Sequence, residues 1–199
     1  MAISVSIDLS KSPELVSCFH LLVLKGVILT TAAGITVRRL LCDQIGIEPD
    51  YLENGIQTIL LDGKAVDNLD ETVVHDGAVL ALSAAMPGLA GAVLRTKGIL
   101  RGLRREISMD NPALNHEAGP ANVTVKLFNR VLQDLGARLL CRGVTVTGKD
   151  LLNRLTGCRQ ELRDGGAVLL LEGQPADFEI IKSCLCTEQS VRLQIVTSG

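Results

Sequence analysis

Residues 143–150 come close to a phosphate-binding loop. They read Gly-Val-Thr-Val-Thr-Gly-Lys-Asp and match every position of the P-loop pattern except the last. A P-loop ends in Ser or Thr, whose hydroxyl binds magnesium, whereas Asp150 would bring a negative charge to the phosphates. The chain also lacks the repeated strand–helix–strand units of such enzymes. We therefore favour an ordinary transition from a strand into a helix over nucleotide binding.

Cysteine thiols are a second group that could do chemistry. Cys184 and Cys186 would share one face of an extended segment, and Cys158 could be a third ligand. Structural zinc sites usually space their cysteines by about two to four residues and add further ligands, which this pattern does not supply. Small buried or loop cysteines are the better interpretation.

The histidines do not form a recognisable catalytic set. They are isolated from one another in the sequence: His20, His75 and His116. No Ser/His/Asp, Cys/His or paired-carboxylate arrangement can be recognised from residue order. His75 precedes the Asp76–Gly77 turn and is expected at the surface. The sequence therefore predicts no catalytic residue, no metal site and no cofactor.

Composition limits the classes of function. Of the 199 residues 47% are hydrophobic but only 2% are aromatic, so the core must consist of Leu, Ile, Val and Ala. A mean hydropathy of +0.31 indicates that apolar faces pack against each other or against a partner. A net charge of −2 and the few aromatic rings argue against nucleic acid as that partner.

We expect a cytoplasmic protein with reduced thiols. The six cysteines are scattered, and the N-terminal residues lack the charged start and apolar run of a signal peptide. The most apolar window, residues 15–35, is interrupted by His20 and Lys25. It therefore predicts core rather than a membrane span.

The elements that would position these residues occur twice, at a nearly constant offset. Each copy has the order strand, strand, helix, strand, strand, with a Thr at the start of the helix and a turn containing Gly after the third strand. In the first copy these elements are residues 3–9, 26–31, 36–46, 57–61 and 79–84. In the second they are residues 123–127, 137–142, 147–157, 167–171 and 191–195.

This pattern predicts an α+β fold of two tandem domains. The smallest stable two-layer solution is a mixed four-stranded sheet with one helix across it. We expect a first domain over residues 1–88, a glycine-rich basic segment and linker over residues 89–121, and a second domain over residues 122–199. The two copies end at Gly88 and Gly199.

Three segments of the first copy resemble a known family. Residues 34–37, 61–67 and 69–82 are similar to the ubiquitin-like β-grasp sulfur carriers of thiamine and molybdopterin biosynthesis, the ThiS/MoaD family. Residues 123–136 of the second copy resemble the opening strand of that family and the turn after it, although the Asp-Gly turn before the last strand is missing. The resemblance implies tandem β-grasp domains.

The resemblance also implies a function at a chain terminus. In that family a tail ending Gly-Gly enters an adenylating, E1-like enzyme, and the terminal carboxylate becomes a thiocarboxylate that passes sulfur to an accepting enzyme. Gly88 is followed by more chain, so Gly199 is the candidate carrier terminus, with Ser198 where the family has Gly. Two interpretations remain: a sulfur carrier activated at Gly199, or a degenerate, non-catalytic β-grasp module that binds a partner enzyme or self-associates.

The segment between the copies carries a local positive charge. Its basic residues are Arg95, Lys97, Arg101, Arg104 and Arg105. They could form a docking strip for an acidic partner, a phosphate or a polyanion. A solvated linker whose charge is balanced elsewhere in the chain is the simpler interpretation.

Overall fold

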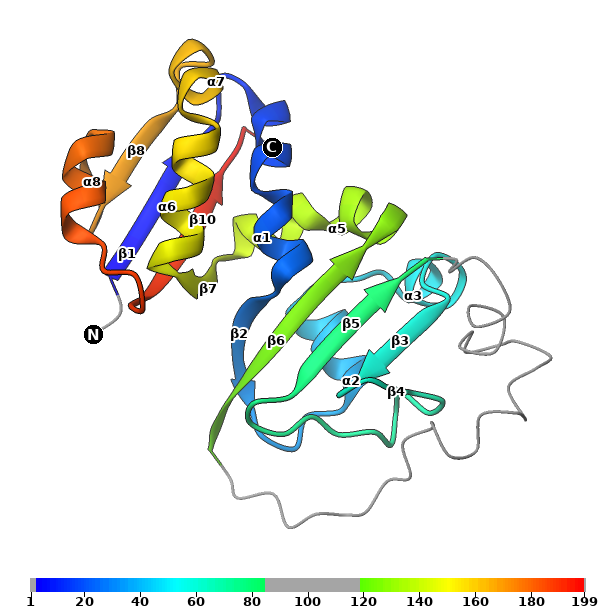
Figure 1. The fold of residues 1–199 in the computed structure, drawn as a ribbon. Coiled ribbons are helices and arrows are strands. Elements are labelled where there is room, and N and C mark those ends of the chain that lie inside the picture. The colour runs from blue at the N-terminus through cyan, green and yellow to red at the C-terminus, as the bar shows by residue number, and fades with distance from the viewer. Residues whose placement is uncertain (1–2, 85–118, 199) are drawn as a thin grey trace. The chain divides into compact units, whose positions relative to one another are not determined.

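The computed structural model describes residues 3–84 and 119–198, which form two units of mixed α+β structure (Figure 1). Unit 1 comprises Met1–Val27 and Gln133–Gly199, and unit 2 comprises Ile28–Leu132. Each unit is described by itself. The helix α5 (Asn129–Arg142) contains the boundary between them.

Unit 2 contains a mixed sheet in the order β4-β3-β5-β6-β2. Its strands are β2 (Val27–Ala32), β3 (Thr58–Leu61), β4 (Lys64–Ala65), β5 (Val79–Ser83) and β6 (Pro120–Phe128). Its helices are α2 (Val37–Arg39), η2 (Leu40–Gln44) and α3 (Pro49–Asn54). The central pair β5 and β6 is parallel, with Val79 opposite Thr124 and Ser83 opposite Phe128.

Unit 1 contains five strands in the order β7-β10-β1-β8-β9, again with parallel and antiparallel neighbours. Its strands are β1 (Ile3–Asp8), β7 (Val144–Thr147), β8 (Val168–Leu171), β9 (Gln174–Pro175) and β10 (Ser190–Val196). Its helices are η1 (Pro13–Phe19), α1 (His20–Lys25), α6 (Gly148–Gly157), α7 (Arg159–Asp164) and α8 (Phe178–Cys184). Here β1 is parallel to β10 and antiparallel to β8.

The opening strands of the two sequence copies have exchanged partners. β1 pairs with the last strand of the second copy, and β6 pairs with the last strand of the first. The domains expected over residues 1–88 and 122–199 therefore differ from the observed units. Both opening strands alternate buried and more exposed residues, so the alternation does not specify a partner. The long segment between β5 and β6 supplies the connection that a parallel pair requires.

The two units also place their central strands differently. In unit 2 the last strand of the first copy, β5, lies beside β3. In unit 1 the last strand of the second copy, β10, lies beside β7, and β1 lies beside β8. β1 thus occupies in unit 1 the place that β5 has in unit 2. The same pair of hydrogen bonds is found at this position in both units. The backbone N–H of Asp62 donates to Val79 O and its carboxylate accepts from Val79 N, and Glu172 makes the same pair of bonds with Ser4.

Three details of the predicted pattern were wrong. Residues 137–142, predicted as a strand, lie in α5, and the strand follows at β7. The reason is helical spacing of buried side chains through this region, at Val131, Leu132, Leu135, Leu139 and Leu140. Each unit also has five strands rather than four, because the two-residue strands β4 and β9 add an edge, and each unit has more than one helix.

The predicted hairpin turns are present in both units. Asp62 and Gly63 have φ of 51° and 78°, and Glu172 and Gly173 have φ of 50° and 78°. Positive φ at both central residues is the geometry of a type I′ turn, whose twist suits two antiparallel strands. Nothing lies within 4 Å of a Cβ added at either glycine, so conformation rather than space requires glycine there.

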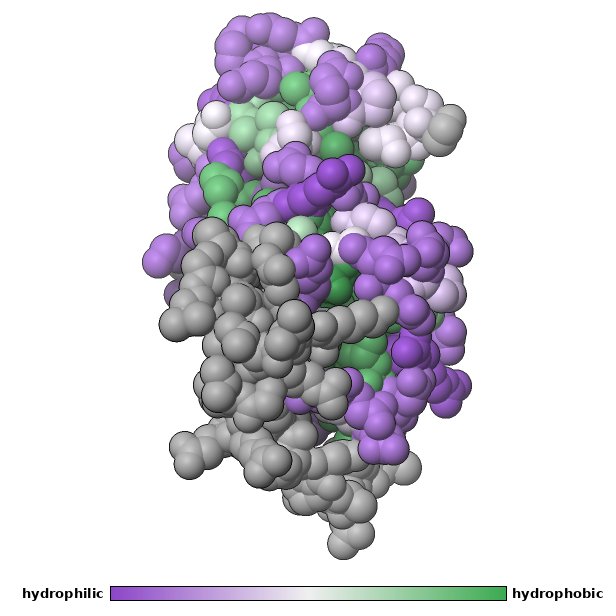
Figure 2. All heavy atoms as spheres, turned by 90° about the vertical axis from the view of Figure 1, so that its right-hand side faces the viewer, coloured by the Kyte–Doolittle hydropathy of each residue, from purple (hydrophilic) through white to green (hydrophobic). Residues whose placement is uncertain are grey.

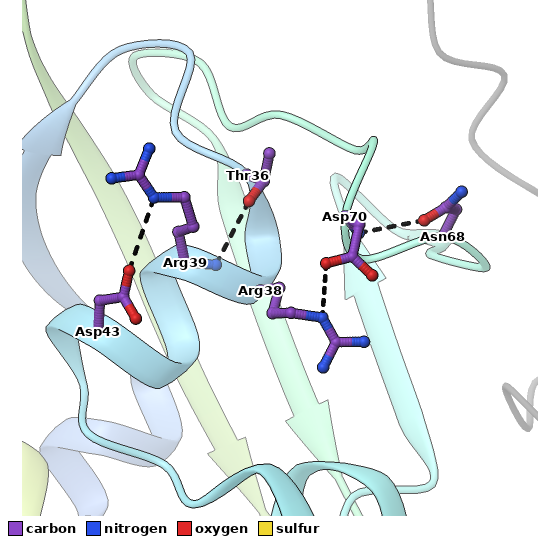
Figure 3. Close-up of polar contacts among 6 residues, drawn as sticks. All are labelled: Thr36, Arg38, Arg39, Asp43, Asn68 and Asp70. Carbon is purple, nitrogen blue, oxygen red and sulfur yellow. Dashed lines mark hydrogen bonds and ion pairs between the residues drawn. The ribbon is translucent and has the colours of Figure 1, made fainter.

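The helix starts predicted at Thr36 and Thr147 are confirmed. The Thr36 hydroxyl accepts from Arg39 N at 3.3 Å, and the Thr147 hydroxyl accepts from Asp150 N at 3.1 Å. Figure 3 shows the surroundings of Thr36, where the Arg38 guanidinium donates to the Asp70 carboxylate at 2.6 Å. This ion pair joins α2 to the loop that leads into β5.

Each unit buries an aliphatic core, with Phe19 as a fully buried ring in unit 1. In the view of Figure 2 hydrophilic residues cover much of the described surface, and apolar residues show between them in places. Four large apolar side chains of the described residues are exposed: Leu21, Val168, Ile180 and Val196. Of the helices that the structure describes, none has the length and apolar character to cross a lipid bilayer.

Candidate functional site

The predicted carrier terminus and docking strip fall largely outside the described residues. Those outside are Gly88, Gly199, Arg95, Lys97, Arg101, Arg104, Arg105 and His116. Ser198 is described, and its hydroxyl donates to Ser10 O at 3.0 Å. Two residues earlier, Val196 O accepts from Leu9 N at 2.7 Å. The chain after β10 is therefore hydrogen-bonded to the segment after β1 as far as Ser198.

The P-loop-like segment has the geometry of a strand-to-helix transition. Gly148 N donates to Gln189 O at 2.8 Å and Lys149 N donates to Thr187 O at 3.1 Å, so these two amides already have backbone acceptors. A P-loop needs such amides for phosphate oxygens. In unit 2 the amides at the matching positions, Val37 and Arg38, likewise donate to carbonyls of the segment before the last strand. The same strand-to-helix transition therefore accounts for the P-loop-like segment of the second copy and for the matching segment of the first.

Asp150 is held by neighbours within unit 1. Its carboxylate accepts from Lys25 Nζ at 2.6 Å and from the Thr147 hydroxyl at 3.0 Å. The bond from Lys25, followed by that from Thr147, lowers the pKa of Asp150 despite the opposing effect of partial burial. Gly148 is required for a separate reason, because an added Cβ would collide with the backbone carbonyl of Cys186.

His75 lies at the surface as predicted, but it is bound on both sides. Its side chain is 44% exposed, Nε2 lies 2.8 Å from the Asp62 carboxylate, and Nδ1 lies 2.8 Å from Asp76 O. Both partners are acceptors, and only imidazolium has two N–H donors. The backbone bond to Asp76, and then the bond to Asp62, therefore raise the pKa of His75, although partial burial opposes this. The arrangement fastens the β3–β4 turn to the loop before β5.

The cysteines considered as metal ligands do not gather. Cys184 and Cys186 are exposed at and after the end of α8, whereas Cys158 is buried beside Cys18. Across residues 3–84 and 119–198, no group of three or more His, Cys, Asp or Glu side chains is placed to hold a metal ion.

Unit 1 contains a groove of about 780 Å³ between α6–α7, β8–β9 and α8. Its apolar lining consists of Leu155, Leu162, Ala167, Val168, Leu169, Pro175, Ala176, Phe178 and Ile180. Val168 and Ile180 are 43% and 47% exposed, which is unusual for large aliphatic side chains. Its charged lining consists of Arg159, Arg163, Asp177 and Glu179. We call this feature the α8 groove.

Three of the four charged residues in the α8 groove are engaged within it. The Arg159 guanidinium lies 4.3 Å from the centre of the Phe178 ring and 3.1 Å from the Glu179 carboxylate. Asp177 caps α8 by accepting from Ile180 N at 2.8 Å. No side-chain partner of Arg163 is found among the described residues. The groove therefore offers one unpaired positive charge beside exposed apolar surface.

Sequence reasoning missed the α8 groove, because it placed no helix between the third and last strands of the second copy. A signal was available in the Asp177 cap followed by Phe178 and the buried Ile181. Comparisons of the chain with protein-family models, with curated proteins and with solved structures find no match.

Proposed function

We propose that this chain is a non-catalytic binding module and that the α8 groove of unit 1 receives a segment of a partner protein. The observation that carries the proposal is the exposed pair Val168 and Ile180 beside Arg163. Exposed aliphatic surface in a groove is stabilised when a partner removes it from water, at about 25 cal/mol per Å² buried. The groove volume of about 780 Å³ is in the range that accommodates several side chains.

The partner segment carries a carboxylate next to apolar side chains. The carboxylate pairs with Arg163, whose planar guanidinium can donate two parallel hydrogen bonds. The apolar side chains cover Val168, Ile180 and the Phe178 ring. Arg159 contributes less to recognition, because Glu179 already neutralises it.

The finer fold is part of the same proposal. The parallel central pair of unit 2, flanked by antiparallel β3 and crossed by a helix that starts at Thr36, supports a β-grasp-like domain. Unit 1 is proposed to be a derived version of that domain, with its two central strands in reversed order. The partner is an enzyme or a second copy of the chain.

An anionic apolar dye tests the groove. We expect anilinonaphthalene sulfonate to bind the chain, and Ile180→Asp to weaken binding about tenfold by placing a like charge and a polar group in the groove. Arg163→Ala should weaken it about threefold by removing the cation. Val196→Asp and Lys182→Ala are matched controls, because these exposed residues do not line the groove. Equal weakening by the controls would refute the proposal.

The sulfur-carrier interpretation instead requires an accessible chain terminus at Gly199. Activation of Gly199 would require the hydrogen bond from Ser198 to Ser10 to open, so that the terminus could enter an adenylating enzyme. Incubation with such an enzyme, ATP and a sulfide source, followed by intact-mass measurement, tests this function. Exchange of a terminal oxygen for sulfur would favour the carrier over the non-catalytic module.

A further inference from the structure

Two thiols from distant parts of the sequence lie together in unit 1. The Cys158 thiol at the junction of α6 and α7 points to the backbone carbonyl of Cys18 in η1, with Sγ 3.9 Å from that oxygen. Cys158 is 5% exposed and Cys18 is more exposed. The Cys158 sulfur thus reaches the backbone of Cys18 itself, and two cysteines that are neighbours in the fold can be joined by a disulfide after backbone adjustment.

A positive charge faces this pair. Arg154, one turn before Cys158 on α6, donates from Nη2 to Cys158 Sγ at 3.4 Å. The remaining Nε–H of Arg154 is buried without a hydrogen-bond partner among the described residues. The nucleophile in thiol oxidation is a negatively charged sulfur, and the guanidinium of Arg154 places a positive charge against the Cys158 sulfur. Burial, and then the bond with Cys158, raise the pKa of Cys18 to about 11, so Cys18 is the weaker nucleophile.

We propose that Cys18 and Cys158 form a reversible disulfide when the protein meets hydrogen peroxide. The Cys158 thiolate attacks one peroxide oxygen, the O–O bond breaks, and hydroxide leaves, giving a sulfenic acid. The Cys18 sulfur then attacks the Cys158 sulfur, the S–OH bond breaks, and the hydroxyl leaves with the Cys18 proton as water. The two sulfurs are each oxidised by one electron and the peroxide is reduced to water. A dithiol reductant reverses the reaction by thiol–disulfide exchange.

The bond would fasten η1 to the α6–α7 junction. It would close a chain segment between residues 18 and 158, so the oxidised unit 1 should resist unfolding more than the reduced form. α6 and α7 form one wall of the α8 groove, through Leu155, Arg159 and Leu162. Oxidation of Cys158 would therefore occur next to the groove residue Arg159. The proposed disulfide does not depend on whether the groove binds a partner.

Tryptic mapping of the full chain tests the proposal without any variant. Trypsin places Cys18 in residues 12–25 and Cys158 in residues 155–159, while Cys184 and Cys186 share residues 183–192. After treatment with hydrogen peroxide and blocking of free thiols, we expect the first two peptides to be joined and to separate on addition of dithiothreitol. Unjoined peptides, with either cysteine blocked as a free thiol or oxidised to sulfinic acid, would overturn the proposal.

Variants check the roles of the residues. Cys18→Ser should abolish the joined peptide and leave a sulfenic acid at Cys158 that dimedone labels, whereas Cys42→Ser in unit 2 should leave the joined peptide intact. Arg154→Gln, which removes the N–H···S bond from the guanidinium to Cys158, should slow its formation about tenfold. An unchanged rate in Arg154→Gln would contradict the proposed order of attack.

Discussion

The exchange of opening strands makes a prediction that separates the observed units from two contiguous domains. Ile7 of β1 is fully buried, and it lies opposite Ile195 of β10 and Leu169 of β8. Leu127 of β6 is 2% exposed and lies opposite Leu82 of β5. Truncating either side chain to Ala should destabilise only the unit in which its strand is central.

The expected magnitude follows from the burial. An Ile→Ala or Leu→Ala change at such a site costs about 2–5 kcal/mol, because apolar contact is lost and a cavity is left. Amide exchange through opening of the affected unit should accelerate tenfold for each ~1.4 kcal/mol, and so by about 30-fold or more. The other unit should keep its exchange rates.

Hydrogen exchange read by mass spectrometry on peptic fragments is the assay. In Ile7→Ala the faster fragments should cover β8 and β10, and in Leu127→Ala they should cover β3 and β5. The two variants control for each other, because they are similar truncations of buried side chains in central strands. The reasoning is refuted if Ile7→Ala accelerates exchange in β3 and β5 and leaves β8 and β10 unchanged.

Three further predictions concern single residues. The stabilisation that His75 gives unit 2 should be complete below the pKa of unfolded imidazole, about 6.5, and should be lost as pH rises through its raised folded pKa. A plot of Tm against pH that loses this slope in His75→Ala checks it, whereas the same slope in both proteins would contradict it. Gly148→Ala should destabilise unit 1 by about 2 kcal/mol or more, because the new Cβ meets the Cys186 carbonyl, and urea unfolding measures this; an unchanged midpoint would contradict it. Thr147→Ala should cost about 1 kcal/mol through loss of the cap to Asp150 N, measured in the same way, and Thr147→Ser should restore most of it.

Local features of the fold could be predicted from the sequence because local residues determine them. The Thr36 and Thr147 caps were predicted from a hydroxyl residue placed before an apolar helical pattern, and both are confirmed. The Asp62–Gly63 turn was predicted from residues that tolerate positive φ, which both adopt.

The pairing of the strands could not be predicted in the same way. β1 and β6 have equivalent patterns of alternating buried and more exposed residues, so the pattern of each strand is compatible with pairing in either unit. The error over residues 137–142 has a related cause, since a short apolar run does not distinguish a strand from the end of a helix. Both outcomes depend on long-range packing that residue order alone does not reveal.

The α8 groove is also a product of tertiary structure. Val168 belongs to β8 and Ile180 to α8, and nothing in their spacing indicates that both border one opening. From the sequence, Arg163 is likewise only a charged residue on a short helix. Its value as a recognition residue depends on Glu179 being paired with Arg159 instead.

Selection of peptides on the intact chain tests the binding proposal most directly. A displayed library of random peptides would be enriched on the wild-type protein and then measured against Ile180→Asp, Arg163→Ala and Val196→Asp. The proposal predicts enriched peptides that carry Asp or Glu beside large apolar residues, that lose binding to the first two variants, and that bind Val196→Asp like the wild type. Peptides that bind Ile180→Asp as well as the wild type would contradict it.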